Sequence, residues 1–468
     1  DLREKYPRIS ELPFDSVRKF MSTLQIIDNE KLMLTKGATD ELLKKCSSIL
    51  VDGQVRDITE EDKKQILEQN NNFAEEGLRV LGYAFKKDAS DELTFDDENN
   101  LTFVGLTSMI DPPREESKDA VEKAIRAGIK PIMITGDHAV TARSIARKIG
   151  IFQDGDMVVD GLTLENMTDE ELARDLEKIS VYARVAPEHK IRIVNAWQAK
   201  GKVVGMSGDG VNDAPALKQA DIGIAMGITG SEVSKDAADM ILTDDNFATI
   251  VKAVTVGRNI FTNIKNAIKY LLTGNTGAIF VVIATTLLAF LDSKFVVPFA
   301  AIQLLFINLV TDSLPAIAIG AEKGTDDVLK QKPRDPNEPI LTRATFTSVL
   351  IEAALIAVAV FAGYYIGIET GEGYATTFAF LTLCLARLFN GFSCRSDQPL
   401  TKIGVFSNKN TVYAFLIGVT LVGIIVFIPA VGSIFKVMSL NITQVLTIIG
   451  LAIAPTIVTQ IIKMIKSR

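Results

Sequence analysis

The sequence has 468 residues, of which 47% are hydrophobic, with 50 basic and 57 acidic side chains and a formal net charge of −7. A chain of this length is too long for one compact domain, and its composition is too apolar for an ordinary soluble protein. Three scattered cysteines and two histidines form no zinc or disulfide framework, and no basic stripe indicates nucleic acid as a partner. Charged residues are dense in residues 1–255 and sparse in residues 256–468. We therefore predict a soluble part followed by a membrane part.

The first hundred or so residues read as a small α+β region. Apolar runs at 31–38 and 78–85 predict strands, and the run ELLKKCSSIL at 41–50 predicts a helix. The ring of Phe14 suits stacking on a purine, and Lys19 and Lys36, the latter beside Gly37, suit contact with phosphate. Each of these residues, taken alone, is also consistent with a core aromatic or a surface lysine.

Two glycine-containing polar turns follow apolar strands in the next part of the chain. The first is TGD at Thr135, Gly136 and Asp137, which leads into a helix, and the second is GDGVND at 208–213. Further short apolar runs at 181–184, 222–225 and 239–242 complete the pattern of a doubly wound α/β sheet. In such a sheet, the chemistry lies at the carboxyl ends of the strands.

The residue types in these turns are those that phosphoryl chemistry requires. Carboxylates at Asp209 and Asp213 suit Mg2+, and the hydroxyl and amides at Thr135 and Gly136 suit phosphoryl oxygens. Lys190 follows another strand and is placed to offset developing negative charge. Two turns with merely solvated aspartates would explain the sequence less well.

Residues 256–468 predict six membrane-spanning helices, because several uncharged stretches approach the length needed to cross about 30 Å of hydrocarbon. The expected spans are about 256–291, 295–320, 344–368, 373–394, 410–435 and 437–464. Basic residues gather in two of the connections and at the C-terminus, which predicts that the soluble part and the C-terminus are cytosolic. The first residues hold no apolar run after positive charge, so we expect no signal peptide.

Charged residues within the spans predict function, because charge is costly in a membrane. In FINLVTDSLPA, Pro315 follows Asn308, Thr311 and Asp312, a pattern that predicts a broken helix whose oxygens face a cation. Asn275 is equally consistent with a ligand and with close helix packing beside glycines. We expect Glu352 to be an interfacial carboxylate. Arg387 lies deeper and needs a partner, although snorkelling to the interface is an alternative.

The order of these motifs resembles the P-type cation-transporting ATPases. The motifs are KGA at 36–38, DPPR at 111–114, TGD, GDGVNDAPAL from Gly208 and NLVTDSLPA from Asn308. The last motif resembles the calcium-pump subgroup in particular, and the resemblance extends over essentially the whole chain. It implies part of a nucleotide-binding domain at 1–108, a phosphorylation domain of the haloacid-dehalogenase type at 109–252, and transmembrane helices five to ten at 253–468.

The resemblance also implies roles for single residues. An ATP site would contain Phe14, Lys19, Lys36, Gly37 and Arg79. A phosphate site would contain Thr135, Gly136, Asp137, Arg184, Lys190, Asn212 and Asp213, with Asp209 on Mg2+. A Ca2+ site would contain Asn275, Asn308, Thr311 and Asp312.

The sequence departs from the family pattern in two ways that affect function. The DKTGT segment, whose aspartate is phosphorylated, does not occur in the chain, so we expect the C-terminal half of a pump that is inactive without its N-terminal half. Ala278 and Cys384 stand where pumps that carry two calcium ions present carboxylates, and Arg387 brings a fixed cation to that depth. This pattern predicts one Ca2+ per ATP, with protons returned.

The expected function is therefore ATP-driven export of Ca2+ from the cytosol through an aspartyl phosphate. The few cysteines and the plain C-terminal KSR favour a bacterial plasma membrane. The alternatives are a pump for Mn2+ or another cation, a membrane-anchored phosphatase of the same fold, and a fragment that transports nothing. Oxygen ligands serve several divalent cations, so the same residues also suit Mn2+.

Overall fold

The computed structural model describes the whole chain except residues 1, 16–17, 88–89, 91, 110–111 and 468. It divides into two compact units, residues 1–251 and 252–468, each of which is described by itself. Residues 110 and 111, where the DPPR motif begins, lie outside the described residues.

The first part of unit 1 is built on a seven-stranded sheet in the order β1-β2-β3-β6-β7-β4-β5. Its elements are α1 (Leu2–Lys5), β1 (Arg8–Leu12), β2 (Phe20–Ile27), β3 (Glu30–Gly37), α2 (Thr39–Leu43), β4 (Cys46–Val51), β5 (Gln54–Asp57), α3 (Glu60–Glu75), β6 (Arg79–Lys87), η1 (Phe95–Asp97) and β7 (Leu101–Met109). Strand β2 alternates between buried and half-buried residues, and its buried side includes Phe20 and Leu24. This alternation is the pattern of a sheet with one face covered by helices.

The helix expected over residues 41–50 is only partly correct. Helix α2 ends at Leu43, and Cys46–Val51 form strand β4, which pairs with β5 and β7. The β-branched residues Ile49 and Val51 fit a pleated strand better than a helix, and the sheet supplies partners on both sides.

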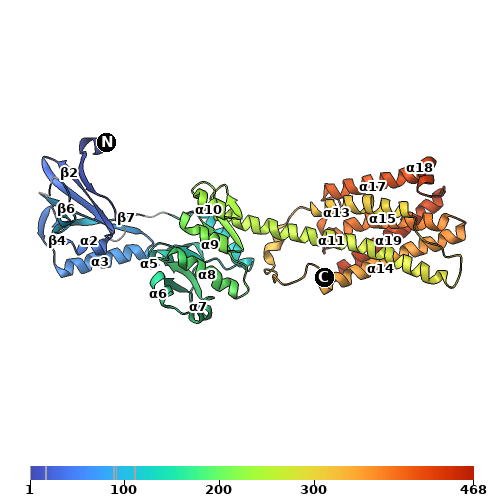
Figure 1. The fold of residues 1–468 in the computed structure, drawn as a ribbon, viewed down its shortest axis with the longest axis horizontal. Coiled ribbons are helices and arrows are strands. Elements are labelled where there is room, and N and C mark those ends of the chain that lie inside the picture. The colour runs from blue at the N-terminus through green and yellow to red at the C-terminus, as the bar shows by residue number, and fades with distance from the viewer. Residues whose placement is uncertain (1, 16–17, 88–89, 91, 110–111, 468) are drawn as a thin grey trace. The chain divides into compact units, whose positions relative to one another are not determined.

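The second part of unit 1 contains two parallel three-stranded sheets rather than one continuous sheet. Their orders are β8-β10-β9 and β11-β12-β13. The elements are α4 (Glu115–Arg126), β8 (Met133–Thr135), α5 (Ala139–Ile149), β9 (Met157–Asp160), α6 (Gly161–Asn166), α7 (Asp169–Asp175), β10 (Ile179–Ala183), α8 (Pro187–Ala199), β11 (Gly205–Gly208), η2 (Val211–Asp213), α9 (Ala214–Gln219), β12 (Ile222–Met226), α10 (Glu232–Ala237) and β13 (Met240–Leu242). The helices alternate with the strands, as the α/β prediction requires (Figure 1).

The two small sheets meet through a shared core. Ile134 of β8 packs with Met206 of β11 and with Val194 of α8. Among the described residues, β8 and β11 each pair with a strand on one side only, so each leaves one edge without a ladder. An edge strand presents unpaired main-chain groups that can pair with a further strand.

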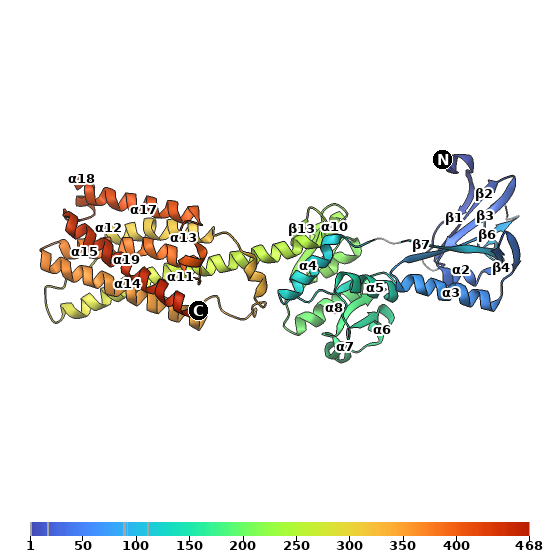
Figure 2. The same cartoon turned by 180° about the vertical axis from the view of Figure 1, so that it is seen from behind.

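Within the described part of the chain, six helices, the first of which begins at Phe247 and continues into unit 2, are long and apolar enough to cross a membrane, which agrees with the predicted number. The elements from here to the C-terminus are α11 (Phe247–Ala289), α12 (Ala301–Phe306), the π-helix η3 (Ile307–Asp312), α13 (Ser313–Gly320), η4 (Asp326–Lys330), α14 (Arg343–Thr370), α15 (Tyr374–Ser393), α16 (Leu400–Ile403), α17 (Lys409–Phe427), α18 (Pro429–Ile434) and α19 (Ile442–Lys466). Helix α15 is the most buried of the spans and packs against α14, α17 and α19 (Figure 2).

Several spans differ from the expected boundaries: the first begins at Phe247 and the sixth at Ile442, and in the second and fifth a proline accounts for the difference. The second span becomes helical only at Ala301, after Pro298, and the fifth ends at Phe427, just before Pro429. Proline lacks the amide that a continuing helix needs. The expected break at 308–312 is instead a stretch of π-helix, which widens the turn without interrupting the helix.

Candidate functional site

The TGD turn is a compact hydrogen-bonded loop at the carboxyl end of β8. The Thr135 hydroxyl donates to Asp137 Oδ2 at 3.1 Å and accepts from the Asp137 amide at 3.1 Å. The amide of Arg184, which has a left-handed φ of 50°, donates to the Asp137 carbonyl at 3.1 Å. This contact fixes the TGD turn beside the end of β10, and the exposed Gly136 and Arg184 remain accessible.

The GDGVND loop is organised around the carboxylate of Asp213, whose side chain is only 8% exposed. Its Oδ2 accepts from the amides of Asp209 and Gly210 at 3.1 and 3.0 Å. Its Oδ1 accepts from Lys190 Nζ at 2.5 Å. Burial alone would raise the pKa of Asp213, but the bonds from Lys190 and the two amides outweigh burial and lower the pKa.

Gly208 is required by this geometry. A Cβ added there would lie 2.5 Å from Asp213 Cβ, so any larger residue would push the carboxylate out of the loop.

Asp209 and Asp213 therefore have different environments. The Asp213 carboxylate accepts hydrogen bonds from the loop amides and from Lys190. Asp209 is exposed, and within the part of the chain that the structure describes its carboxylate makes no hydrogen bond or ion pair. The main chain of Asp209 is fixed, because its carbonyl accepts from the Ser231 amide at 2.8 Å and from the Ser234 hydroxyl at 3.1 Å. An exposed carboxylate on a fixed loop suits Mg2+, and Asn212 is also exposed beside it.

The residues expected around a nucleotide cluster at one end of the first sheet. Lys36 pairs in register with Met21 of β2 and Tyr83 of β6, and Lys19 immediately precedes β2. Phe14 is 62% exposed, so its ring is not part of the core. Gly37 is needed because a Cβ there would lie 2.2 Å from Phe20 Cβ.

Arg79 lies at the start of β6, and its Nη2 lies 3.4 Å from Asp137 Oδ1. The guanidinium is 72% exposed, so this contact is weak.

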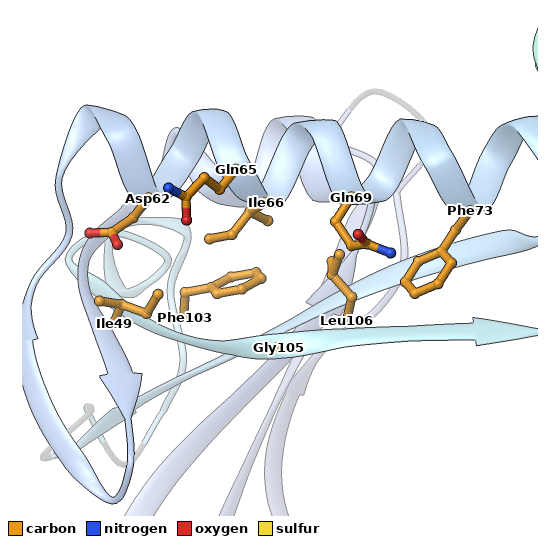
Figure 3. A pocket seen from close by; sticks show the side chains of 9 residues that line it. All are labelled: Ile49, Asp62, Gln65, Ile66, Gln69, Phe73, Phe103, Gly105 and Leu106. Atoms are coloured by element: carbon orange, nitrogen blue, oxygen red, sulfur yellow. The ribbon is translucent and has the colours of Figure 1, made fainter.

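A cavity of about 360 Å³ lies elsewhere in unit 1, between α3 and the strands below it (Figure 3). Its lining comprises Ile49, Asp62, Gln65, Ile66, Gln69, Phe73, Phe103, Gly105 and Leu106. None of the residues expected to bind a nucleotide lines this cavity.

The membrane unit has its own polar cluster around Asp312. Arg387 Nη1 lies 2.5 Å from Asp312 Oδ1, and Nη2 donates to Asn275 Oδ1 at 3.0 Å. Arg387 is 1% exposed, which excludes the alternative that its side chain snorkels to the interface. Gly274 permits this approach, because a Cβ there would lie 2.8 Å from Arg387 Nε.

The remaining residues of the expected ion site lie in different surroundings. Thr311 is buried, its hydroxyl donates to the Ile307 carbonyl at 2.8 Å, and its carbonyl accepts from the Tyr270 hydroxyl. Asn308 is exposed. Ala278 and Cys384 both belong to the buried apolar core of the bundle.

Two ion pairs in the membrane unit were not expected from the sequence. Glu352, which we expect to lie near the interface, is buried within the protein, and its carboxylate lies 2.7 Å from Lys269 Nζ of α11. Arg395 is fully buried and bonds both oxygens of Glu322 at 2.7 and 2.9 Å. The sequence shows that Glu352 and Arg395 are charged residues within or beside a span. It does not show which residue pairs with each, because that depends on how the helices pack.

Fold and site together define a multi-pass membrane protein. Its soluble unit, residues 1–251, carries turns whose residue types suit phosphate binding, and its membrane unit, residues 252–468, carries a buried carboxylate. Two family models match the chain: "P-type ATPase, cytoplasmic domain N" over residues 1–116, and "Cation transporting ATPase, C-terminus" over residues 296–465.

The chain is also similar over its length to named calcium-transporting ATPases. It is 48% identical to calcium-transporting ATPase lmo0841 of Listeria monocytogenes, with 100% of this chain and 53% of that protein aligned. The values are 46%, 100% and 53% for calcium-transporting ATPase 1 of Lactococcus lactis, and 39%, 99% and 50% for calcium-transporting ATPase 1 of Saccharomyces cerevisiae. The chain spans about half the length of the curated relatives it matches, and it belongs to the P-type cation-transporting ATPases.

Proposed function

We propose that this chain is the C-terminal half of a pump that uses ATP to move Ca2+ out of the cytosol. Its relatives are named for calcium transport, and the chain carries both a phosphate-type loop and a membrane carboxylate. The observation that carries the proposal is the cluster of Asp312, Asn275 and Arg387 within the spans. A phosphatase has no use for such a cluster at that depth.

In the soluble unit, the chain's own residues would hold the reacting phosphate. The turn at Thr135 and Gly136 presents a hydroxyl and amides, and Lys190 places positive charge next to the GDGVND loop. Bound Mg2+ would supply charge neutralisation for phosphoryl transfer, with Asp209 as its carboxylate. The γ-phosphoryl group would leave ADP and bond to an aspartate supplied by the other half of the pump, and water would later cleave that bond.

The unpaired edges of β8 and β11 support the proposal that the two halves of the pump share one reaction centre. Both edges are unpaired among the described residues, and both strands end in the loops that carry the proposed phosphate residues. A strand from the other half of the pump that paired between them would bring its own residues to the same carboxyl end. The chain alone would then lack a complete reaction centre and would be inactive.

In the membrane unit, the Arg387 guanidinium is a positive charge that belongs to the protein itself. The guanidinium does not deprotonate, so it holds positive charge beside Asp312 throughout a transport cycle. This arrangement leaves room for one Ca2+ per ATP, with protons returned in exchange. The soluble unit and both chain ends of this half would face the cytosol of a bacterium, and the spans would cross its plasma membrane.

The proposal is tested in the full-length pump reconstituted in vesicles, with ATP-dependent 45Ca2+ uptake and Mg2+-dependent phosphoenzyme as readouts. Asp209→Asn should abolish the phosphoenzyme because the metal loses its anionic ligand. Asp154→Asn, which changes an exposed aspartate with a side chain 97% accessible, should leave it intact. Normal phosphorylation in Asp209→Asn, or no uptake by the unmodified pump, would contradict the proposal.

A further inference from the structure

Arg18 is the centre of the segment that carries the proposed nucleotide residues. Its Nη2 donates to the Pro13 carbonyl at 2.8 Å, and its amide donates to Asp15 Oδ1 at 2.9 Å. Its guanidinium also lies over two aromatic rings, 5.4 Å from the centre of Phe20 and 4.8 Å from the centre of Phe95. Arg18 thus contacts Pro13, Asp15 and the rings of Phe20 and Phe95.

The partner of Arg18 is a carboxylate buried in the sheet. Glu98 is 2% exposed and accepts from Arg18 Nη1 through Oε2. Its other oxygen, Oε1, accepts from the Ser22 hydroxyl at 2.8 Å, and Ser22 in turn bonds Thr35 at 2.9 Å. A buried carboxylate is tolerated only when it is paired and hydrogen-bonded, and Arg18 supplies the charge.

The geometry of the neighbours follows from this anchor. Phe14 directly follows Pro13, and Lys19 directly follows Arg18. Lys19 has a left-handed φ of 62°, an unfavourable conformation for a residue with a Cβ. Two main-chain bonds hold it there: its amide donates to the Asp15 carbonyl at 2.7 Å, and its carbonyl accepts from Ala38 at 3.0 Å. The main chain at Lys19 is therefore fixed before any ligand arrives.

We propose that Arg18 and Glu98 form a positioning pair that presents Phe14 and Lys19 to an adenine nucleotide. The inference rests on the proposed nucleotide site. In this assignment neither member of the pair touches the nucleotide, because the Arg18 head group is already used by Glu98, Pro13 and the two rings. Without the pair, Phe14 and Lys19 lose this support and must be ordered on binding, which weakens affinity.

The test compares two phosphoryl donors in the full-length pump. ATP needs the adenine platform, whereas inorganic phosphate, which forms the phosphoenzyme by reversal of hydrolysis, does not. Arg18→Met should raise the half-saturating ATP concentration by about tenfold, the scale of two side chains left to be ordered on binding. Phosphorylation from inorganic phosphate should change less than twofold.

Three further variants make the test decisive. The double variant Arg18→Met/Glu98→Gln removes the unpaired buried charge, so it should fold and still need about tenfold more ATP. Arg56→Met, which removes an exposed arginine paired with Asp62 in the same region, should behave like the unmodified pump. Phe14→Ala reports on the nucleotide site itself and should also raise the ATP requirement.

Each contrary outcome has a distinct meaning. Unchanged ATP saturation in both Arg18 variants, with Phe14→Ala impaired, would overturn the positioning pair but leave the nucleotide site intact. Equal losses with ATP and with inorganic phosphate in the double variant would assign the pair a structural role only and would also overturn the inference. An unimpaired Phe14→Ala would overturn the site and the inference together.

Discussion

Replacing Arg387 with methionine is the sharpest perturbation of the membrane cluster. The guanidinium is 1% exposed and lies 2.5 Å from Asp312 Oδ1 and 3.0 Å from Asn275 Oδ1. Methionine retains much of the length and apolar stem but removes the charge and both hydrogen bonds. The variant leaves Asp312 without its cation in the ion-free protein.

The size of the effect follows from the burial of the pair. Removing one member of a buried ion pair typically costs 3–5 kcal/mol, because the other member remains buried and unpaired. Ca2+ binding would restore a positive partner to Asp312, so a large part of that cost would return as binding energy. Recovery of about 3 kcal/mol corresponds to roughly a hundredfold gain in affinity.

The assay is thermal unfolding of the detergent-solubilised full-length pump over a range of Ca2+ concentrations. Arg387→Met should melt lower than the unmodified pump without Ca2+ and should be stabilised more by Ca2+. Arg343→Met, which changes an exposed arginine at the start of α14, is the control and should match the unmodified pump. Weaker or unchanged Ca2+ affinity in Arg387→Met would refute competition between the guanidinium and the ion.

Three other expectations follow from particular contacts. Because the pKa of Asp213 is lowered in the folded protein, the ionised carboxylate stabilises the fold fully above about pH 3.9, its pKa in the unfolded chain, and this stabilisation is lost as the pH falls through the lower folded pKa. The melting temperatures of Asp213→Asn and of the unmodified pump should therefore differ above about pH 5 and converge in stronger acid. A difference in melting temperature that stays constant with pH would contradict this expectation. Arg395→Met should lower the free energy of unfolding by roughly 3–5 kcal/mol because Glu322 loses its buried partner, whereas a change below 1 kcal/mol in denaturant titrations would show that the pair is dispensable. Phe14→Ala should weaken nucleotide binding by about 1–3 kcal/mol, the scale of base stacking on an aromatic ring, as measured by calorimetry, and unchanged binding would exclude an adenine platform there.

The sequence predicted the α/β soluble part, the six spans and the family because these depend on local periodicity and on contiguous motifs. The TGD and GDGVND turns each contain hydrogen bonds between near neighbours, such as Asp209 and Asp213. Their loops could therefore be interpreted from composition and order alone.

The sequence could not reveal pairings between distant elements. Glu352 meets Lys269, and Glu322 meets Arg395, only because separate helices pack together. The carboxylates of Asp209 and Asp213 are equivalent as sequence, and only the structure shows that Asp213 is buried with Lys190 while Asp209 remains exposed. Arg18 gave no sequence signal at all, since its role depends on Glu98, which lies in the loop before β7.

The most direct test of the central claim is a count of ions and phosphates on the same protein. Equilibrium 45Ca2+ binding and maximal phosphorylation by ATP should be measured on purified full-length pump, alongside Asp312→Asn. We expect one Ca2+ bound for each phosphorylation site, and loss of that ion in Asp312→Asn. Two ions for each site, or undiminished binding in Asp312→Asn, would contradict it.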